Sequence, residues 1–347
     1  MLSKKSICLA AISSVALAAC GGPAGSGGGT REVVRAVGSS TVYPFATAVA
    51  EKVGQATGKA PVIESTGTGA GMKLFCAGVG ISHPDIENAS RRMKASEYED
   101  CVANGVTEVV EIQVGIDGIA FAEAKEGPNI KLTPTDVYKA LASNPYGEPN
   151  TAKTWQDVNA ALPAIPILVY GPPSTSGTRD ALAELILEAG CKSNPEMKAL
   201  KETDEDKYKA ICTQVREDGA YVDSGENDNL IVQKIAQNPK AIGVFGYSFL
   251  EENTDKLKGI PMSDVEPTYA TISDFSYPGA RPLYIYVKKA HVGVIKGLSE
   301  YVAEWAQAWG ADGYLKGKGM VVSPEEVRTR NAEVAKNMTP LDPAELK

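Results

Sequence analysis

Histidine is scarce in this chain: its 347 residues include only 2, His83 and His291. Catalytic triads and most zinc sites need an imidazole within reach of a nucleophile or of other metal ligands. The patterns G-x-S-x-G and H-E-x-x-H, which mark common serine hydrolases and zinc proteases, are also absent. The sequence therefore disfavours the common hydrolases, and we expect neither a metal nor a cofactor.

An excess of positive charge is also missing. Lys and Arg total 35 against 43 Asp and Glu, which gives a net charge of -8. Proteins that hold nucleic acid or anionic lipid by bulk charge have the opposite sign, so we expect no nucleic-acid partner. Hydrophobic residues make up 43% of the chain and charged residues 22%, as in ordinary globular proteins of one or two domains. Any site for an anion must therefore be local.

The chain has no apolar run long enough to span a bilayer comfortably. Its longest run, at residues 7–19, follows Lys4 and Lys5, and this layout predicts a signal peptide over residues 1–19. The run ends in LAAC, which resembles the bacterial lipobox and predicts a lipidated Cys20 on an exported, membrane-anchored protein. The glycine-rich residues 20–30 then form a flexible tether. The alternative is an ordinary signal peptide, with Cys20 incidental.

Four cysteines remain in the body once Cys8 leaves with the signal peptide and Cys20 takes lipid. An even number in an oxidising compartment predicts disulfides. Metal binding is the rival interpretation, but the cysteines form no C-x-x-C pair and have no histidine nearby. Local pairing gives two separate loops, closed by Cys76–Cys101 and Cys191–Cys212.

Short apolar runs alternate with helical patterns along the body, as in an α/β protein. The glycines of residues 115–118 predict a hinge between two of the strands. Both histidines are expected at the surface. Strands are predicted at 33–37, 61–65, 107–114, 118–122, 165–170, 241–247 and 283–287, and helices at 44–56, 71–79, 134–142, 154–161, 176–189, 230–237 and 292–309.

Three loops share a composition suited to anions: GSSTVYP at 38–44 (the first anion loop), STGTGAGMK at 65–73 (the second) and STSGTR at 174–179 (the third). Each follows a predicted strand and opens a predicted helix. Glycines let the backbone approach an anion, hydroxyls add donors, and the first helical turn has free N–H groups. Each loop alone could be a capped helix start. None has the spacing of a nucleotide-binding fingerprint.

These loops occur in order with the motifs NASRRMK and AIGVFGYSFL and with the lipobox. In this combination the chain resembles the phosphate-binding protein (PstS) family of bacterial phosphate ABC importers. The resemblance implies a type II periplasmic binding-protein fold, in which two α/β lobes are joined by crossover strands. It places the first lobe at residues 31–115 plus 276–347 and the second at 116–275. The implied function is non-enzymatic: the protein captures inorganic phosphate and delivers it to a membrane permease.

The resemblance also implies the ligand-binding residues. Two departures from the family pattern affect charge: its acidic residue is replaced by Arg91, and its arginine four residues before Ser176 is replaced by Pro172. Arg179 can restore the lost positive charge. The phosphate-binding residues implied are Ser40, Thr41, Val42, Thr68, Gly69, Arg91, Ser176, Gly177, Thr178 and Arg179.

The two arginines have alternatives. Arg91 either donates to the anion or belongs to a solvated cluster with Arg92, in which case another carboxylate must accept the proton of phosphate, because arginine has no acceptor. Asp117 and Glu226 are candidates, although Asp117 can also simply form a turn. Arg179 can instead pair with a carboxylate on its own helix.

Two other functions compete with phosphate capture. An exported phosphatase or esterase would use Ser39, Ser40 or Ser176 as its nucleophile, and it would need a base beside that hydroxyl. A surface sensor or adhesin could keep the same fold without transport.

Overall fold

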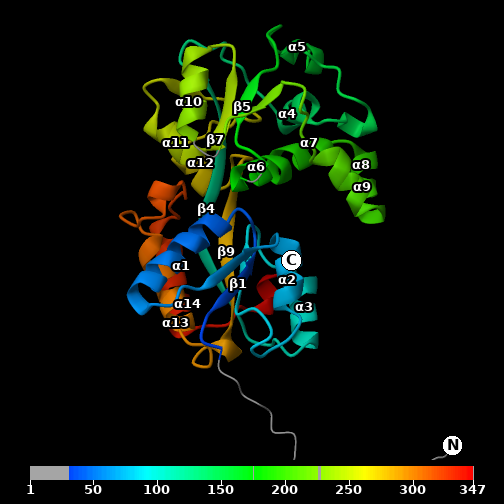
Figure 1. Cartoon of the computed structure of the whole chain (residues 1–347). Coiled ribbons are helices and arrows are strands. Elements are labelled where there is room, and N and C mark those ends of the chain that lie inside the picture. The colour runs from blue at the N-terminus through cyan, green and yellow to red at the C-terminus, as the bar shows by residue number, and fades with distance from the viewer. Residues whose placement is uncertain (1–30, 175, 226–227, 347) are drawn as a thin grey trace, which may run out of the picture.

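The computed structural model describes residues 31–174, 176–225 and 228–346. The predicted signal peptide, tether and Cys20 lie outside these residues, as does Glu226. Within the described ranges, no helix has both the length and the apolar character needed to cross a membrane. Figure 1 shows two lobes, one above the other, with strands running between them.

The first lobe, at the bottom of Figure 1, is built on a mixed sheet. β1 pairs in parallel with β2 and β3, and β9 runs antiparallel between β3 and β4. Apart from β2, which has no fully buried residue, these strands are mostly buried, as expected for apolar runs that end in turn residues. They are β1 (Arg35–Gly38), β2 (Val62–Ser65), β3 (Ile86–Ala89), β9 (Ala280–Lys288) and the first half of β4 (Val109–Ala124).

Helices cover both faces of this sheet. α1, α13 and α14 pack on one face around a core that includes Val49 and Trp305. α2 and α3 pack on the other face, around Phe75 and Tyr286. The bounds are α1 (Tyr43–Thr57), α2 (Thr68–Phe75), α3 (Ala95–Ala103), α13 (Leu298–Ala308) and α14 (Glu325–Asn337).

The second lobe has one continuous apolar core, in which Phe121, Tyr138 and Trp155 are fully buried. In its sheet β5 lies parallel between β6 and β7, and β4 pairs antiparallel with β7 and β8. The strands are β5 (Val169–Gly171), β6 (Tyr221–Asp223), β7 (Ile242–Gly246) and β8 (Leu257–Gly259). The helices are α4 (Pro134–Leu141), α5 (Trp155–Val158), α6 (Gly177–Ala181), α7 (Glu188–Cys191), α8 (Pro195–Thr203), α9 (Glu205–Cys212), α10 (Asp228–Gln237), α11 (Tyr247–Glu252) and α12 (Tyr269–Ser273).

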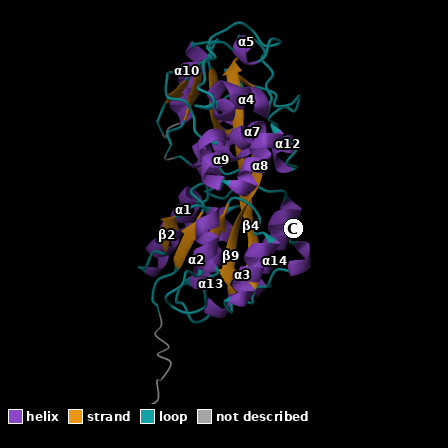
Figure 2. Cartoon of the chain, turned by 90° about the vertical axis from the view of Figure 1, so that its right-hand side faces the viewer, coloured by secondary structure: helices purple, strands orange, loops and turns teal. Residues whose placement is uncertain are grey.

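The strands β4 and β9 join the two lobes (Figure 2). The prediction of two strands separated by a hinge at residues 115–118 is wrong, because β4 is one strand of 16 residues. Pairing with β9 continues across the glycines, with only a register shift between Gln113 and Gly115. Met320 occupies the space that a side chain at position 115 would need, since its Sδ lies 2.3 Å from the place of a Cβ. This pairing sets Asp117 directly opposite Arg281.

The helix predicted at residues 292–309 is shorter than expected. α13 begins only at Leu298, because Gly293 and Gly297 adopt φ values of 78° and 83°, outside the helical region. The surface position expected for His291 is also wrong: its side chain is 2% exposed.

Candidate functional site

A cavity of about 360 Å³ lies where the first and third anion loops meet. The two loops follow β1 and β5, and ligand sites in open α/β sheets form at such carboxyl ends of parallel strands. The lining residues come from both lobes and from β4. They are Ser40, Thr41, Tyr43, Pro44, Phe45, Asp117, Ser176, Gly177, Thr178, Asp228, Gly246, Phe249, Lys318 and Gly319.

The first anion loop is held in shape by Ser39, whose side chain is buried. Its backbone N–H donates to the carbonyl oxygen of Asn88 over 2.7 Å. Its Oγ accepts from the backbone N–H groups of Thr41, at 3.1 Å, and Val42, at 3.4 Å. The loop therefore presents the side chains of Ser40 and Thr41 to the cavity from a fixed backbone.

The third anion loop is closed by the N-cap of α6. Ser176 Oγ accepts a hydrogen bond from the backbone N–H of Thr178 over 3.2 Å. Serine is a preferred N-cap because its side chain satisfies one of the free N–H groups of the first turn. The sequence pattern therefore predicts this element correctly.

The two loops touch across the boundary between the lobes. The hydroxyl of Thr41 donates to the carbonyl oxygen of Gly177 over 3.4 Å. A Cβ at position 177 would lie 2.7 Å from the Cα of Thr41, so only glycine permits this approach. The hydroxyl of Ser40 also donates to the carboxylate of Asp180, which lies in α6 of the second lobe. The structure thus holds the cleft closed.

Arg281, at the start of β9, and Lys318, in the cavity lining, are two cations that the sequence analysis missed. The side chain of Arg281 is 6% exposed. Its guanidinium donates to Thr41 Oγ1 over 2.7 Å, to Asp117 Oδ2 over 3.1 Å, and to Glu184 Oε2. The sequence offers no sign of this position, because only the pairing of β9 with β4 brings Arg281 to Asp117.

Carboxylates surround this guanidinium. Burial raises the pKa of Asp117, against the lowering effect of Arg281, and nearby Glu184 and Asp180 raise it further. Burial also raises the pKa of Asp180, although its hydrogen bond from Ser40 acts in the opposite direction. Both carboxyl groups are therefore easier to protonate than carboxyl groups in water.

The second anion loop lies beside the first one. Its residues Thr66 and Gly67 donate backbone hydrogen bonds to the carbonyl oxygen of Gly38, each over 2.8 Å. Thr68 Oγ1 lies 3.1 Å from Ser90 Oγ and accepts from the Ser90 N–H over 3.2 Å. Neither Thr68 nor the neighbouring Gly69 is among the residues that line the 360 Å³ cavity.

The two arginines implied by the resemblance point to other partners. Arg91 donates to both carboxylate oxygens of Glu97, over 2.9 and 2.7 Å. The guanidinium carbon of Arg179 lies 4.2 Å from the ring centroid of Tyr221. Neither arginine is among the cavity-lining residues.

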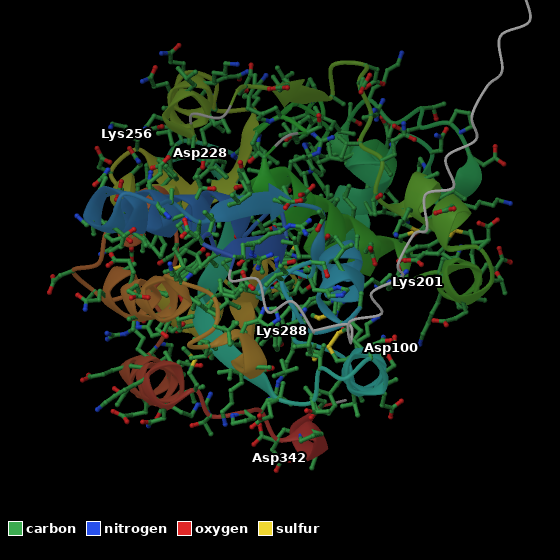
Figure 3. The ribbon with its side chains drawn as sticks, turned by 60° about the horizontal axis from the view of Figure 1, so that its bottom comes forward. Asp100, Lys201, Asp228, Lys256, Lys288 and Asp342 are labelled. Atoms are coloured by element: carbon green, nitrogen blue, oxygen red, sulfur yellow. A yellow bond between two sulfur atoms is a disulfide. The ribbon has the colours of Figure 1, made fainter. Side chains whose placement is uncertain are left out.

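Both predicted cysteine pairs are disulfide bonds, which confirms the pairing of Cys76 with Cys101 and of Cys191 with Cys212. Each bond lies within one lobe. In Figure 3, the label Asp100 marks the region of the first disulfide bond. The label Lys201 marks α8, which lies in the loop that the second disulfide bond closes.

No histidine base accompanies the hydroxyls of the cavity. His291 Nδ1 donates to Asp85 over 2.6 Å and its Nε2 accepts from the Gly80 N–H over 3.0 Å, at the amino ends of β1 and β3. His83 lies in the same loop as Asp85 and is also absent from the cavity lining. Among the described residues, no group of His, Cys, Asp and Glu has the arrangement of a metal site.

A family model described as a PBP superfamily domain matches residues 24–311 of the chain. The phosphate-binding protein PstS of Staphylococcus saprophyticus is 32% identical over 297 residues, covering 83% of this chain and 81% of the relative. The protein SphX of Synechococcus elongatus is 32% identical over 277 residues, covering 76% of this chain and 71% of the relative.

Solved structures show the same architecture. A possible phosphate-binding protein from Planctomyces limnophilus superposes with a TM-score of 0.68 at 26% identity. The match covers 89% of this chain and 99% of that one. PstS from Borrelia burgdorferi has a TM-score of 0.55 at 19% identity, over 85% of this chain and 100% of its own, and shows the fold alone. These likenesses confirm the predicted α/β fold with two lobes joined by crossover strands.

Proposed function

We propose that this chain, which belongs to the phosphate-binding protein (PstS) family of the PBP superfamily, captures inorganic phosphate between its lobes and delivers it to the permease of an ABC importer. It is a receptor and not an enzyme. We assign residues 31–115 and 276–347 to the first lobe and residues 116–275 to the second.

The observation that carries this proposal is the contact between the first and third anion loops at Thr41 and Gly177. Each loop belongs to a different lobe, so donors from both can reach one small anion only when the cleft is closed. The proposed ligand groups are the hydroxyls of Ser40, Thr41, Ser176 and Thr178 with the backbone of Gly177. Gly69 belongs to the proposed set as well, and Val42 N–H and Thr68 Oγ1 join it when their present hydrogen bonds to Ser39 and Ser90 open.

Titration of the phosphate-stripped full chain tests the proposal. A ligand that binds only the folded state stabilises it by roughly 2.7 kcal/mol at 100 times its Kd, so the melting temperature should rise with phosphate. T178V removes a cavity hydroxyl and should weaken binding roughly tenfold to a hundredfold, as expected for a lost hydrogen bond to a charged group. T203V, on the exposed face of α8, is the matched control. A melting curve unmoved by phosphate would overturn the proposal.

Asp117 is the proposed acceptor for the proton of phosphate. Its carboxylate lines the cavity, and Arg281 occupies Oδ2. Sulfate has no proton to donate at neutral pH, so a carboxylate in this place disfavours it. D117N should therefore lower the ratio of the phosphate affinity to the sulfate affinity. An unchanged ratio would assign the acceptor role elsewhere.

We also propose that lipid on Cys20 anchors the protein to the membrane, at the periplasmic side or cell surface. The position of Arg31 in the first lobe supports this arrangement. Arg31 donates to the carbonyl oxygens of Ile81 and His83, at the amino ends of the strands, and the anion loops lie at the opposite ends. A tether from Arg31 would leave the cleft accessible to a permease. C20S should release the protein from membranes of the native host, and continued membrane pelleting would contradict the anchor.

A further inference from the structure

We infer that Arg281 is a positioning residue that couples the first anion loop to closure of the second lobe, an inference that rests on the proposed phosphate site. Its guanidinium contacts Thr41, Asp117 and Glu184, and we call these four residues the Arg281 junction. The partners come from three elements: the loop after β1, the crossing strand β4, and the helical segment that continues α6.

Two of the three contacts stay within the first lobe and the crossing strands. Asp117 and Arg281 are register partners in β4 and β9, so their ion pair forms whatever the position of the second lobe. The bond to Thr41 ties the same guanidinium to the first anion loop. Because a guanidinium is a rigid planar fork, these two bonds leave its remaining nitrogen Nη1 with a fixed direction.

Glu184, in the second lobe, accepts a hydrogen bond from this remaining nitrogen. It lies in the π-helical turn Leu182–Leu187, which follows α6 directly. The Thr41–Gly177 and Ser40–Asp180 contacts join the same two parts of the molecule. All three contacts link the first anion loop or Arg281 to residues 177–184, so opening the cleft must break them together.

Electrostatics assigns Arg281 a second task. Asp117, Asp180 and Glu184 repel one another, and Arg281 lowers the pKa of both Asp117 and Asp180 against the effect of burial. Asp117 and Asp228 line the cavity and would repel an anion, and the cation in its lining is Lys318. Arg281 adds a second positive charge behind this lining, where it pairs with Asp117.

The sharpest variant is E184Q, because Glu184 is half exposed and its loss should not unfold the chain. The junction predicts faster phosphate release, roughly two- to fivefold, with little change in the association rate, because only the closed state exchanges the ion pair with Arg281 for a weaker hydrogen bond to a neutral acceptor. A pure charge effect predicts the reverse, since removing a negative charge near an anion would tighten binding. E202Q removes the same charge from the exposed end of α8 and is the control.

A double-mutant cycle of E184Q with R281Q on thermal stability separates closure from static packing. Coupling between the two positions should be present in saturating phosphate and weak in stripped protein. Equal coupling in both conditions, or a release rate for E184Q equal to that of wild type, would overturn the inference while leaving phosphate binding intact. Failure of the wild-type chain to respond to phosphate would instead overturn the proposed function.

Discussion

At the scale of single residues, Glu87 is the most unusual group beneath the anion loops. Its side chain is fully buried, and neither carboxyl oxygen has a hydrogen-bond partner among the described residues. It packs against Gly38 of the first anion loop and Gly71 of α2. Burial, reinforced by Glu97, raises the pKa of Glu87 well above its usual value of 4.5, so the group is readily held in its neutral form.

The raised pKa of Glu87 makes stability depend on pH. The folded state keeps a proton that the unfolded chain releases above about pH 4.5, so stability should fall as pH rises toward the raised pKa of Glu87. E87Q keeps the shape without the titrating proton and should flatten this decline. Urea unfolding from acidic to alkaline pH measures the difference, and parallel curves for the two proteins would contradict it.

Gly71 should not tolerate a larger residue. A Cβ there would lie 2.3 Å from Glu87 Oε2 and 2.6 Å from the Cα of Gly38. G71A should therefore lower the free energy of unfolding by about 1–3 kcal/mol, despite the higher helix propensity of alanine. G69A is the matched control in the same helix, because nothing lies within 4 Å of a Cβ at that position. Equal stability of the two variants would contradict this prediction, because it would show that Glu87 moves aside for the added methyl group.

At the scale of elements, the disulfide Cys191–Cys212 joins the end of α7 to the end of α9 and encloses α8. Replacing both cysteines with alanine should cost about 3 kcal/mol, chiefly by freeing the unfolded chain. Phosphate affinity should change little, since neither cysteine lines the cavity. Denaturant unfolding and a phosphate titration of the same variant check both statements; a large loss of affinity at full folding would link these helices to the site.

The element types were predictable where pattern and local chemistry agree. The strand before each anion loop and the serine N-cap of α6 follow from short-range preferences. The prediction of a hinge at residues 115–118 was wrong, because pairing with β9 overrides the local freedom of the glycines. The predicted start of the helix at residue 292 was also wrong. The apolar spacing continues through Gly293 and Gly297, but their positive φ values delay the start of α13 to Leu298.

At the scale of the whole molecule, phosphate should make the protein more compact. Donors from both lobes meet at one cavity, so binding shifts the population toward the closed form. Small-angle scattering should give a smaller radius of gyration with phosphate than without it. The T178V variant should need more phosphate for the same change. An equal radius in both conditions would mean that the lobes are already closed without ligand.

The candidate site was predictable only in its loops. Thr41, Ser176, Gly177 and Thr178 line the cavity, and their motifs are continuous in the sequence. Arg281 is far from them along the chain, and the register of two antiparallel strands is needed to place it. Charge at this site is thus a property of tertiary pairing, which a single sequence does not reveal.

The position of β9 also sets the order in which the molecule can be completed. β9 lies between β3 and β4, yet it follows every strand of the second lobe in the chain. A ribosome releases the N-terminal part first, so the second lobe has all its strands while the first lobe still has a gap in its sheet. The last segment to emerge carries Arg281 and the helices α13 and α14. Competence to capture a ligand therefore arrives with the C-terminus, and a chain cut short before residue 280 has no closed first sheet on which to assemble the cleft.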